Sequence, residues 1–268
     1  MGADHVTQPT PYPDVNAVLR ELLAAVQTIL GDYFVGLYLY GSLSSGDFNP
    51  LSSDVDFLVV TTTALPGEVI AALEAMHTRL AAGGSKWAAK LEGSYIPQTA
   101  LRRYDPAGPA YPTLNEGRFY LAPHASDWVI QRHVIRKQGV TVAGPPPKTL
   151  IDPIQPDELR AAVQGILRGW WSPMADTPGR LHSRGYQAYA ILTMCRALYT
   201  LEYGEVVSKP AATRWAQQVL GERWGGLIEA AAHAWWHDTP FDRFGETVAF
   251  IRFAVECSQP LQTPIGEV

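Results

Sequence analysis

The chain has 268 residues and a formal charge of −5, from 21 Lys and Arg against 26 Asp and Glu. Its length accommodates one or two domains, and its 47% apolar content excludes wholesale disorder. No apolar run reaches the ~20 residues that cross a bilayer. The first residues of the chain lack the features of a secretory signal, and two cysteines cannot build a disulfide framework. We therefore expect a cytoplasmic protein that binds neither membranes nor, given its acidic balance, nucleic acid.

The first half of the chain alternates predicted helices and strands. Residues 1–13 are rich in Pro and Thr and predict a flexible tail. Asp14 is predicted to cap an amphipathic helix that Gly31 ends. Beyond it, apolar and β-branched runs predict three strands, at Phe34–Tyr40, Val55–Thr63 and Lys90–Ile96. A helix from Pro66 to about Ala82 is predicted between the second and the third strand.

Five prolines between Pro97 and Pro123 predict an irregular connection there. A helix over residues 126–138 and a short strand over Val140–Ala143 follow, and then a Gly-Pro-Pro-Pro run that neither element can continue.

After Pro156 the pattern becomes helical throughout. Five helices are predicted, at Asp157–Trp171, Tyr186–Tyr203, Lys209–Leu220, Arg223–Trp236 and Phe241–Cys257. An α+β domain with a mixed sheet over residues 14–155 is thus expected to precede an all-α bundle over residues 156–268.

A Gly-Ser pair follows the first predicted strand. Gly41 permits the backbone to approach a ligand closely, and the exposed N–H groups with the Ser42 hydroxyl suit a phosphate. Ser53 closes the polar loop that follows, before the chain enters the second strand. The pattern predicts a phosphate site beside the sheet.

Two acidic residues open the second strand. Asp54 and Asp56 are two positions apart, so their side chains point to the same face. Such pairs are common on solvent-exposed faces, but Asp56 lies within an apolar run, where an unpaired carboxylate is costly. Mg²⁺ takes oxygen ligands and leaves room for phosphate oxygens, and Glu92 on the third strand could join as a ligand or act as a base.

These residues resemble a known signature. Gly41-Ser42 followed by Asp54-x-Asp56 is similar to the motif of the DNA polymerase β-like nucleotidyltransferases. The longer string from Tyr40 to Val59 most resembles the aminoglycoside adenylyltransferases that act on streptomycin and spectinomycin. Further similarity, reaching from about residue 15 to about residue 235, is found at Leu91-Glu92, Gly139–Pro145, Asp152-Pro153, Trp171–Pro173, Ile191–Tyr199 and Gly204–Lys209.

The resemblance implies a Mg²⁺-dependent enzyme with two domains. A nucleotidyltransferase domain would come first, and a helical domain that contacts ATP and the acceptor would follow. ATP would be bound through Gly41, Ser42 and Ser53, with Lys209 of the helical domain on its phosphates. The metal ligands would be Asp54, Asp56 and Glu92, and Glu92 would also deprotonate the acceptor hydroxyl, which attacks the α-phosphorus and releases pyrophosphate. We expect a monomer.

The acceptor loop departs from the family pattern. Between Met174 and Gln187 the chain is longer, and Tyr186 falls about where the streptomycin enzymes carry an Asp. Arg180 and Arg184 would repel a cationic drug. The candidate acceptor residues are Trp171, Asp176, His182, Tyr186 and Glu116.

Three functions remain open at this point. The first is AMP transfer to a small hydroxylated and cationic acceptor, an aminoglycoside or aminocyclitol, conferring resistance. The second keeps the chemistry but uses a protein hydroxyl or another metabolite. The third is a nucleotide-binding module without catalysis, against which the intact Asp54, Asp56 and Glu92 argue.

Overall fold

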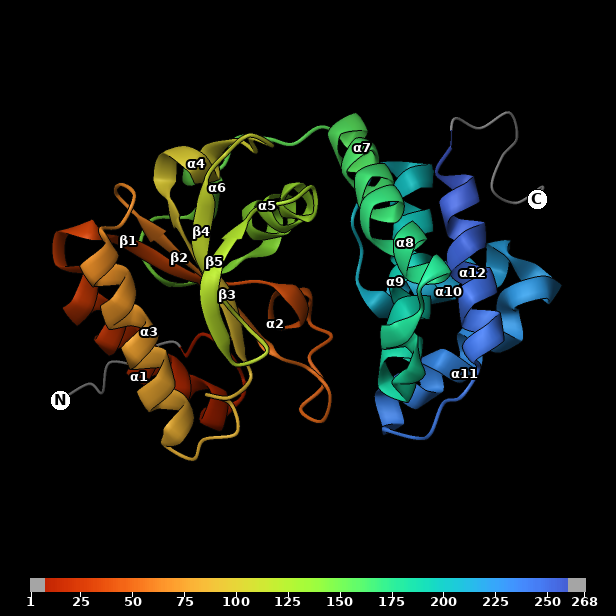
Figure 1. Ribbon diagram of the computed structural model, residues 1–268, viewed down its shortest axis with the longest axis horizontal. Helices are drawn as coiled ribbons and strands as arrows, with labels where there is room; N and C mark the ends of the chain where they lie inside the picture. The colour runs from red at the N-terminus through yellow and green to blue at the C-terminus, as the bar shows by residue number, and fades with distance from the viewer. Residues whose placement is uncertain (1–7, 260–268) are drawn as a thin grey trace, which may run out of the picture. The chain divides into compact units, whose positions relative to one another are not determined.

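A computed structural model describes residues 8–259 of the chain (Figure 1). The chain divides into two compact units, which we call the sheet unit (residues up to 45, 53–125 and 134–153) and the helical unit (46–52, 126–133 and from 154 onward). Two short segments of the predicted first domain thus belong to the helical unit. The predicted limits 1–13, 14–155 and 156–268 stay predictions, and residues 1–7 of the predicted tail lie outside the described residues.

The sheet unit is built on a mixed sheet of six strands in the order β5-β4-β3-β2-β1-β6. Among the described strands only β2 and β3 run parallel, and every other neighbouring pair is antiparallel. This confirms the mixed sheet expected from the sequence. The strands are β1 (Phe34–Leu39), β2 (Val55–Thr61), β3 (Leu91–Pro97), β4 (Ala110–Asn115), β5 (Arg118–Pro123) and β6 (Val140–Ala143).

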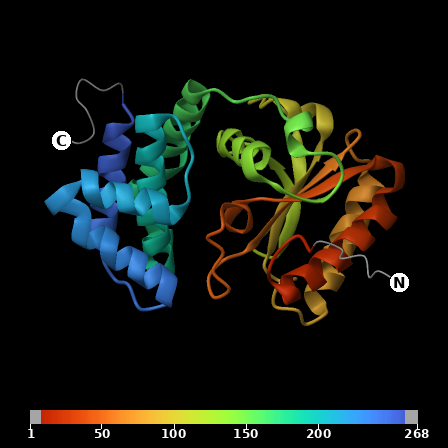
Figure 2. The same cartoon turned by 180° about the vertical axis from the view of Figure 1, so that it is seen from behind.

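Two helices, α1 (Pro13–Leu30) and α3 (Gly67–Ala82), pack side by side on one face of this sheet (Figures 1 and 2). The apolar residues of α1 recur at helical spacing, and Val18, Leu22 and Val26 are almost fully buried. The predicted N-cap at Asp14 was wrong. The cap is Tyr12, because Pro13 has the fixed φ that suits a first helical position, and Asp14 lies within the first turn.

The expectation of an irregular connection from Pro97 to Pro123 was also wrong. The segment folds into the short helix α4 (Gln98–Arg102) and the hairpin β4–β5. Pro112 is tolerated inside β4 because the described β3–β4 pairing begins only beyond it, at Thr113 and Leu114. Its carbonyl accepts a hydrogen bond from Ser94 Oγ at 3.0 Å.

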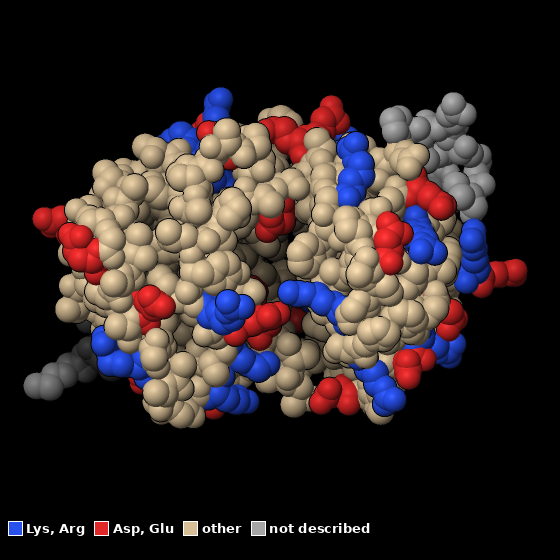
Figure 3. Space-filling model, viewed as in Figure 1, with Lys and Arg blue, Asp and Glu red and all other residues tan. Residues whose placement is uncertain are grey.

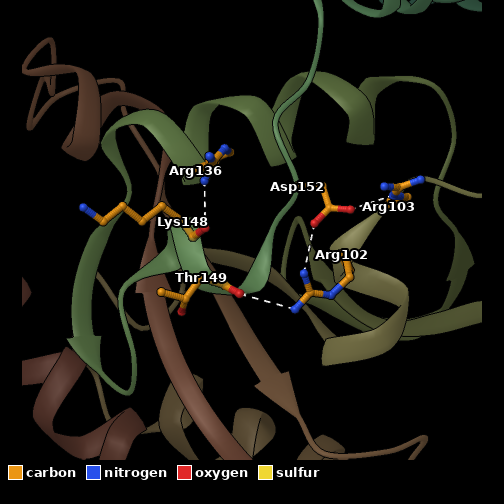
Figure 4. Close-up of polar contacts among 6 residues, drawn as sticks. All are labelled: Arg102, Arg103, Arg136, Lys148, Thr149 and Asp152. Carbon is orange, nitrogen blue, oxygen red and sulfur yellow. Dashed lines mark hydrogen bonds and ion pairs between the residues drawn. The ribbon is translucent and has the colours of Figure 1, made fainter.

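Two arginines hold the last residues of the sheet unit (Figure 4). Arg102 Nη1 and Arg103 Nε donate to the two oxygens of Asp152 at 2.9 and 2.6 Å. Arg103, and secondarily Arg102, hold the pKa of Asp152 below its ordinary value. The same close-up shows Arg102 reaching the carbonyl of Thr149 in α6 (Pro147–Leu150), so this end of the unit is fastened to α4.

The helical unit is organised around α9 (Arg184–Tyr203), which packs against α7 (Pro156–Ile166), α10 (Lys209–Val219), α11 (Gly221–His237) and α12 (Phe244–Cys257). A π-helical stretch, Leu167–Trp171, continues α7 into the short helix α8 (Ser172–Asp176). Ala190, Ile191, Met194 and Leu198 of α9 are fully buried in the common core. Up to residue 259, where the described part of the chain ends, the predicted all-helical second half is therefore confirmed.

The charged surface matches the mild acidity of the sequence. In the view of Figure 3, acidic and basic side chains are interspersed over the visible face of each unit, with wide areas of other residues between them. Between residues 8 and 259, none of the helices combines the length and apolarity that a membrane span requires.

Candidate active site

The Gly-Ser pair lies where β1 ends and the short helix α2 (Gly41–Ser45) begins. Gly41 has φ of +60°, a conformation that favours glycine. A Cβ at this position would collide with the Asp56 carboxylate, so that carboxylate lies directly against the turn. The Tyr40 N–H also donates to the Asp56 carbonyl at 3.1 Å. The turn and Asp56 thus form one local unit.

The three predicted carboxylates come from adjacent parallel strands. Asp56 of β2 is the register partner of Glu92 of β3, so their side chains leave the sheet on the same face. Asp54 immediately precedes β2, and Lys90 immediately precedes β3. Lys90 Nζ lies 3.9 Å from Asp54 Oδ1 and donates to the Ser53 carbonyl at 3.0 Å. The structure therefore brings the acidic residues together, with one lysine beside them.

Glu92 is a half-buried carboxylate whose pKa is perturbed. Burial raises its pKa above the ordinary value, and the negative charge of Asp54 adds to the rise. The backbone N–H of Glu116 donates to Glu92 Oε1 at 3.2 Å and opposes the rise. A carboxylate with a raised pKa is suited to accept a proton near neutral pH.

Glu116 lies at the tip of the β4–β5 hairpin. The two-residue turn consists of Glu116 and Gly117, with φ of +49° and +71°. Positive φ at both central positions is typical of a type I′ turn, which usually carries Asn, Asp or Gly. Glu116 is therefore an uncommon residue in a standard hairpin turn.

The donor chemistry at this edge fits Mg²⁺. Asp54 and Asp56 offer hard carboxylate oxygens, and magnesium sites are commonly completed by waters and substrate phosphates rather than by a full protein cage. Among the residues that the structure describes, no three Asp, Glu, His or Cys side chains converge closely enough to hold an ion by themselves.

The helical unit places Lys209 at the start of α10. Ser208 caps this helix by accepting from the Ala211 N–H at 3.4 Å, and Pro210 follows within the first turn. The Lys209 ammonium lies over the Trp235 ring, 4.1 Å from its centroid, and 5.3 Å from that of Tyr189. These distances are typical of cation–π interaction, so the ammonium is held against the two rings.

A ladder of aromatic rings runs from this lysine through the helical unit. Trp235 and Tyr189 have centroids 6.1 Å apart, Tyr189 and Tyr186 5.4 Å, and Tyr186 and Trp171 6.2 Å. Trp171 is only 2% exposed, whereas Tyr186 and Tyr189 are partly exposed. Of the predicted acceptor residues, Trp171 and Tyr186 thus belong to the ladder.

The remaining predicted acceptor residues of this unit contact α12. Arg252 Nη2 lies 3.7 Å from Asp176 Oδ1, and the His182 ring stacks on Phe244 with centroids 5.0 Å apart. Arg184, expected to repel a cation, lies 3.5 Å from Asp242 Oδ2, which offsets its charge. A cavity of about 300 Å³ lies beside Arg184 and is also lined by Trp235, Asp238 and Ser52.

Two regions of the chain match known protein families. Residues 149–254 match the family described as "Aminoglycoside adenylyltransferase, C-terminal domain", and residues 19–79 match the nucleotidyltransferase domain family. A spectinomycin 9-adenylyltransferase of Campylobacter jejuni is 25% identical over 81% of this chain and 84% of its own length. An aminoglycoside (3'') (9) adenylyltransferase of Shigella flexneri is 24% identical over 83% of this chain and 86% of its own length. Residues 149–254 thus carry the C-terminal domain of the aminoglycoside adenylyltransferases, and the similarity to these enzymes extends over most of the chain.

A similar fold is also found among solved structures. A spectinomycin adenyltransferase of Enterococcus faecialis, crystallised with ATP and spectinomycin, aligns with a TM-score of 0.73 over 91% of this chain and 98% of its own. The two sequences are 17% identical, so the likeness concerns the fold.

Sequence reasoning missed four participants in these arrangements: Lys90, the Glu116 N–H, Tyr189 and Trp235. Lys90 could have been noticed, since it precedes Glu92 by two positions on a predicted strand. Tyr189 lies three positions after Tyr186, so both fall on one face of a helix. Nothing local indicates the contacts of Trp235 or the Glu116 amide, because each depends on a partner distant in the chain.

Proposed function

We propose that this protein transfers AMP from ATP to a hydroxyl of an aminoglycoside or aminocyclitol antibiotic, in a Mg²⁺-dependent reaction. One observation supports the chemistry above all others. Asp56 and Glu92 are register partners on parallel strands, with Asp54 and the Gly41 turn beside them. The substrate class is supported by the relatives, whose names describe spectinomycin and aminoglycoside adenylyltransferases.

Glu92, in the sheet unit, accepts the proton of the acceptor hydroxyl while the oxygen of that hydroxyl attacks the α-phosphorus of ATP. The bond from the α-phosphorus to the bridging oxygen breaks, and pyrophosphate leaves. Asp54 and Asp56 would hold Mg²⁺, which when bound neutralises charge on the phosphates. Glu92 as a further metal ligand stays a prediction.

Phosphate binding is assigned to backbone and cationic groups. The turn at Gly41 and Ser42, with Ser53, offers N–H and hydroxyl donors on the sheet unit. Lys209 on the helical unit supplies a positive charge for the phosphates, and its cation–π contacts keep the ammonium in a defined place. The protein mainly positions reactants and stabilises charge in such a transfer.

For the acceptor, Tyr186 and Glu116 are the best supported of the predicted residues. Tyr186 is a partly exposed ring of the ladder, and Glu116 adds a carboxylate suited to a cationic group. Trp171 supports the ladder from within the core. Asp176 and His182 stay predictions.

The test is direct. Purified protein with ATP and Mg²⁺ should release pyrophosphate when streptomycin or spectinomycin is present, and mass spectrometry should find the drug carrying AMP. Absence of product across a broad panel of aminoglycosides would overturn the acceptor class. Labelled ATP with a cell lysate then distinguishes transfer to a protein, and ATP binding without any transfer would indicate the non-catalytic alternative.

A further inference from the structure

The turn between β4 and β5 contacts the carboxylate that the proposed function assigns to proton transfer. We propose that Glu116 is a positioning residue, whose backbone N–H, presented by the type I′ turn, fixes one oxygen of Glu92 in place. The inference rests on the proposed role of Glu92. It concerns the Glu116 amide, whatever its side chain does.

The position of the donor follows from the sheet. In the β3–β4 ladder, Gly93 pairs with Leu114 and Ser94 pairs with Thr113. One further step along these antiparallel strands brings Glu92 opposite Asn115, the last residue before the turn. The Glu116 amide therefore lies next to Glu92, and it donates to Oε1 at 3.2 Å.

Glu92 thus has a neighbour on each side in the sheet. On one side its register partner is Asp56 of the parallel strand β2. On the other side the hairpin tip supplies the hydrogen bond. A bond to one oxygen restricts rotation of the carboxylate and leaves the second oxygen to accept a proton.

The turn conformation matters more than the residue type. The contact uses a backbone N–H, so residues that tolerate positive φ should retain it, whereas a β-branched residue at φ of +49° would distort the turn. The Glu116 side chain does not create the contact and carries the same sign of charge as Glu92. The amide is therefore separable from the side chain by experiment.

The sharpest comparison replaces one atom group. In Glu116→Gly the amide is kept, and in its ester counterpart, with glycolic acid at position 116, the N–H becomes an oxygen. We expect kcat for AMP transfer to be at least about tenfold lower in the ester than in Glu116→Gly, with KM for ATP within about twofold. Equal kcat in the two proteins, with equal melting temperatures, would overturn the inference.

A double-mutant cycle separates positioning from general damage. In a Glu92→Gln background the ester should produce no further loss of kcat, because the carboxylate that the amide at position 116 positions is already absent. A further loss of similar size in that background would overturn the inference. Wild-type protein without any transfer would instead contradict the proposed function, which keeps the two failures distinct.

A second pair of variants gives the same test if the ester protein does not fold. With Glu92 present, Glu116→Asn should retain at least about fivefold higher kcat than Glu116→Val, because Asn tolerates positive φ and Val does not. In the Glu92→Gln background the Asn and Val variants should have equal kcat. Equal kcat with Glu92 present, or an undiminished difference after Glu92→Gln, would contradict positioning through the amide.

Discussion

Asp56 and Glu92 are register partners on the only two parallel strands of the described sheet. The pairing places a candidate metal ligand and a candidate base on the same face of the sheet, at the edge where the Gly41 turn lies. Burial and the charge of Asp54 raise the pKa of Glu92.

Replacing Glu92 with Gln should separate binding from chemistry. The amide keeps the size and the ability to accept the Glu116 hydrogen bond, but it cannot take a proton. We expect kcat to fall by about 100-fold or more, with ATP affinity changed by less than about threefold. Rapid-quench measurement of AMP transfer and calorimetric titration of ATP would check this, and unchanged kcat would remove Glu92 from the mechanism.

Asp54→Ala and Asp56→Asn should make ATP binding insensitive to Mg²⁺. In the unaltered protein, Mg²⁺ should strengthen ATP binding because the two carboxylates and the phosphates share the ion. Titrations with Mg²⁺ and with EDTA would measure the difference. Asp32→Ala removes an exposed carboxylate of the same unit and serves as the control. A full Mg²⁺ effect in both site variants would contradict the assignment.

The Gly41 turn offers a matched pair of glycine substitutions. Gly41→Ala and Gly84→Ala both place a Cβ at positive φ, which costs about 1–2 kcal/mol. Only at Gly41 does the new atom meet the Asp56 carboxylate, whereas Gly84 has open space. The melting temperatures of Gly41→Ala and Gly84→Ala should therefore fall by similar amounts. ATP binding and turnover should be lost only in Gly41→Ala. Normal turnover in that variant would show that Asp56 can move without consequence.

The contact between Lys209 and Trp235 predicts a graded effect. Trp235→Leu keeps an apolar side chain but removes the ring face, so kcat/KM for ATP should fall about three- to fivefold, the equivalent of about 0.5–1 kcal/mol of cation–π energy. Trp236→Leu, on the same helix, is the control. In a Lys209→Ala background Trp235→Leu should add little, and a full additional loss would mean that Trp235 acts independently of the lysine.

The elements that present the carboxylates could be predicted from the sequence because their signals are local. The apolar runs around Asp56 and Glu92 identified β2 and β3 within one or two residues, and the spacing of Asp54 and Asp56 placed them on one face. The hairpin β4–β5 was missed because the five prolines of the segment from Pro97 to Pro123 dominate the local pattern. Glu116-Gly117 also lacks the Asn or Asp that usually marks a two-residue turn.

Long-range arrangement explains the rest of what was missed. Residues 46–52 and 126–133 lie within the first half of the chain, yet they group with the helical unit. Asn49 Nδ2, for example, donates to the Trp235 carbonyl at 3.4 Å, across more than half of the sequence. Periodicity reports on one element at a time. Neither this contact nor the approach of Trp171 and Trp235 to the two tyrosines of α9 therefore has a sequence signature.

The buried His77 should make the stability of the sheet unit depend on pH. Its Nε2 lies 2.7 Å from the Tyr95 hydroxyl, its ring stacks between Phe57 and Phe119, and burial lowers its pKa from 6.5 to about 4. Between these two values the unfolded state binds a proton that the folded state does not, so the free energy of unfolding falls as pH drops from about 6.5 to about 4. The total loss is on the order of 3 kcal/mol.

The contribution of His77 to the pH dependence of the free energy of unfolding can be isolated with His77→Phe. This variant keeps an aromatic ring between the same neighbours. The variant loses the partner of the Tyr95 hydroxyl and should be less stable at pH 7, by about 1–3 kcal/mol. Its stability should nevertheless fall less between pH 6.5 and pH 4 than that of the unaltered protein. Because the chain has two units, urea unfolding is best followed by pulsed hydrogen exchange in peptides from β2 and β3. Parallel pH curves for the two proteins would show that His77 does not titrate on unfolding.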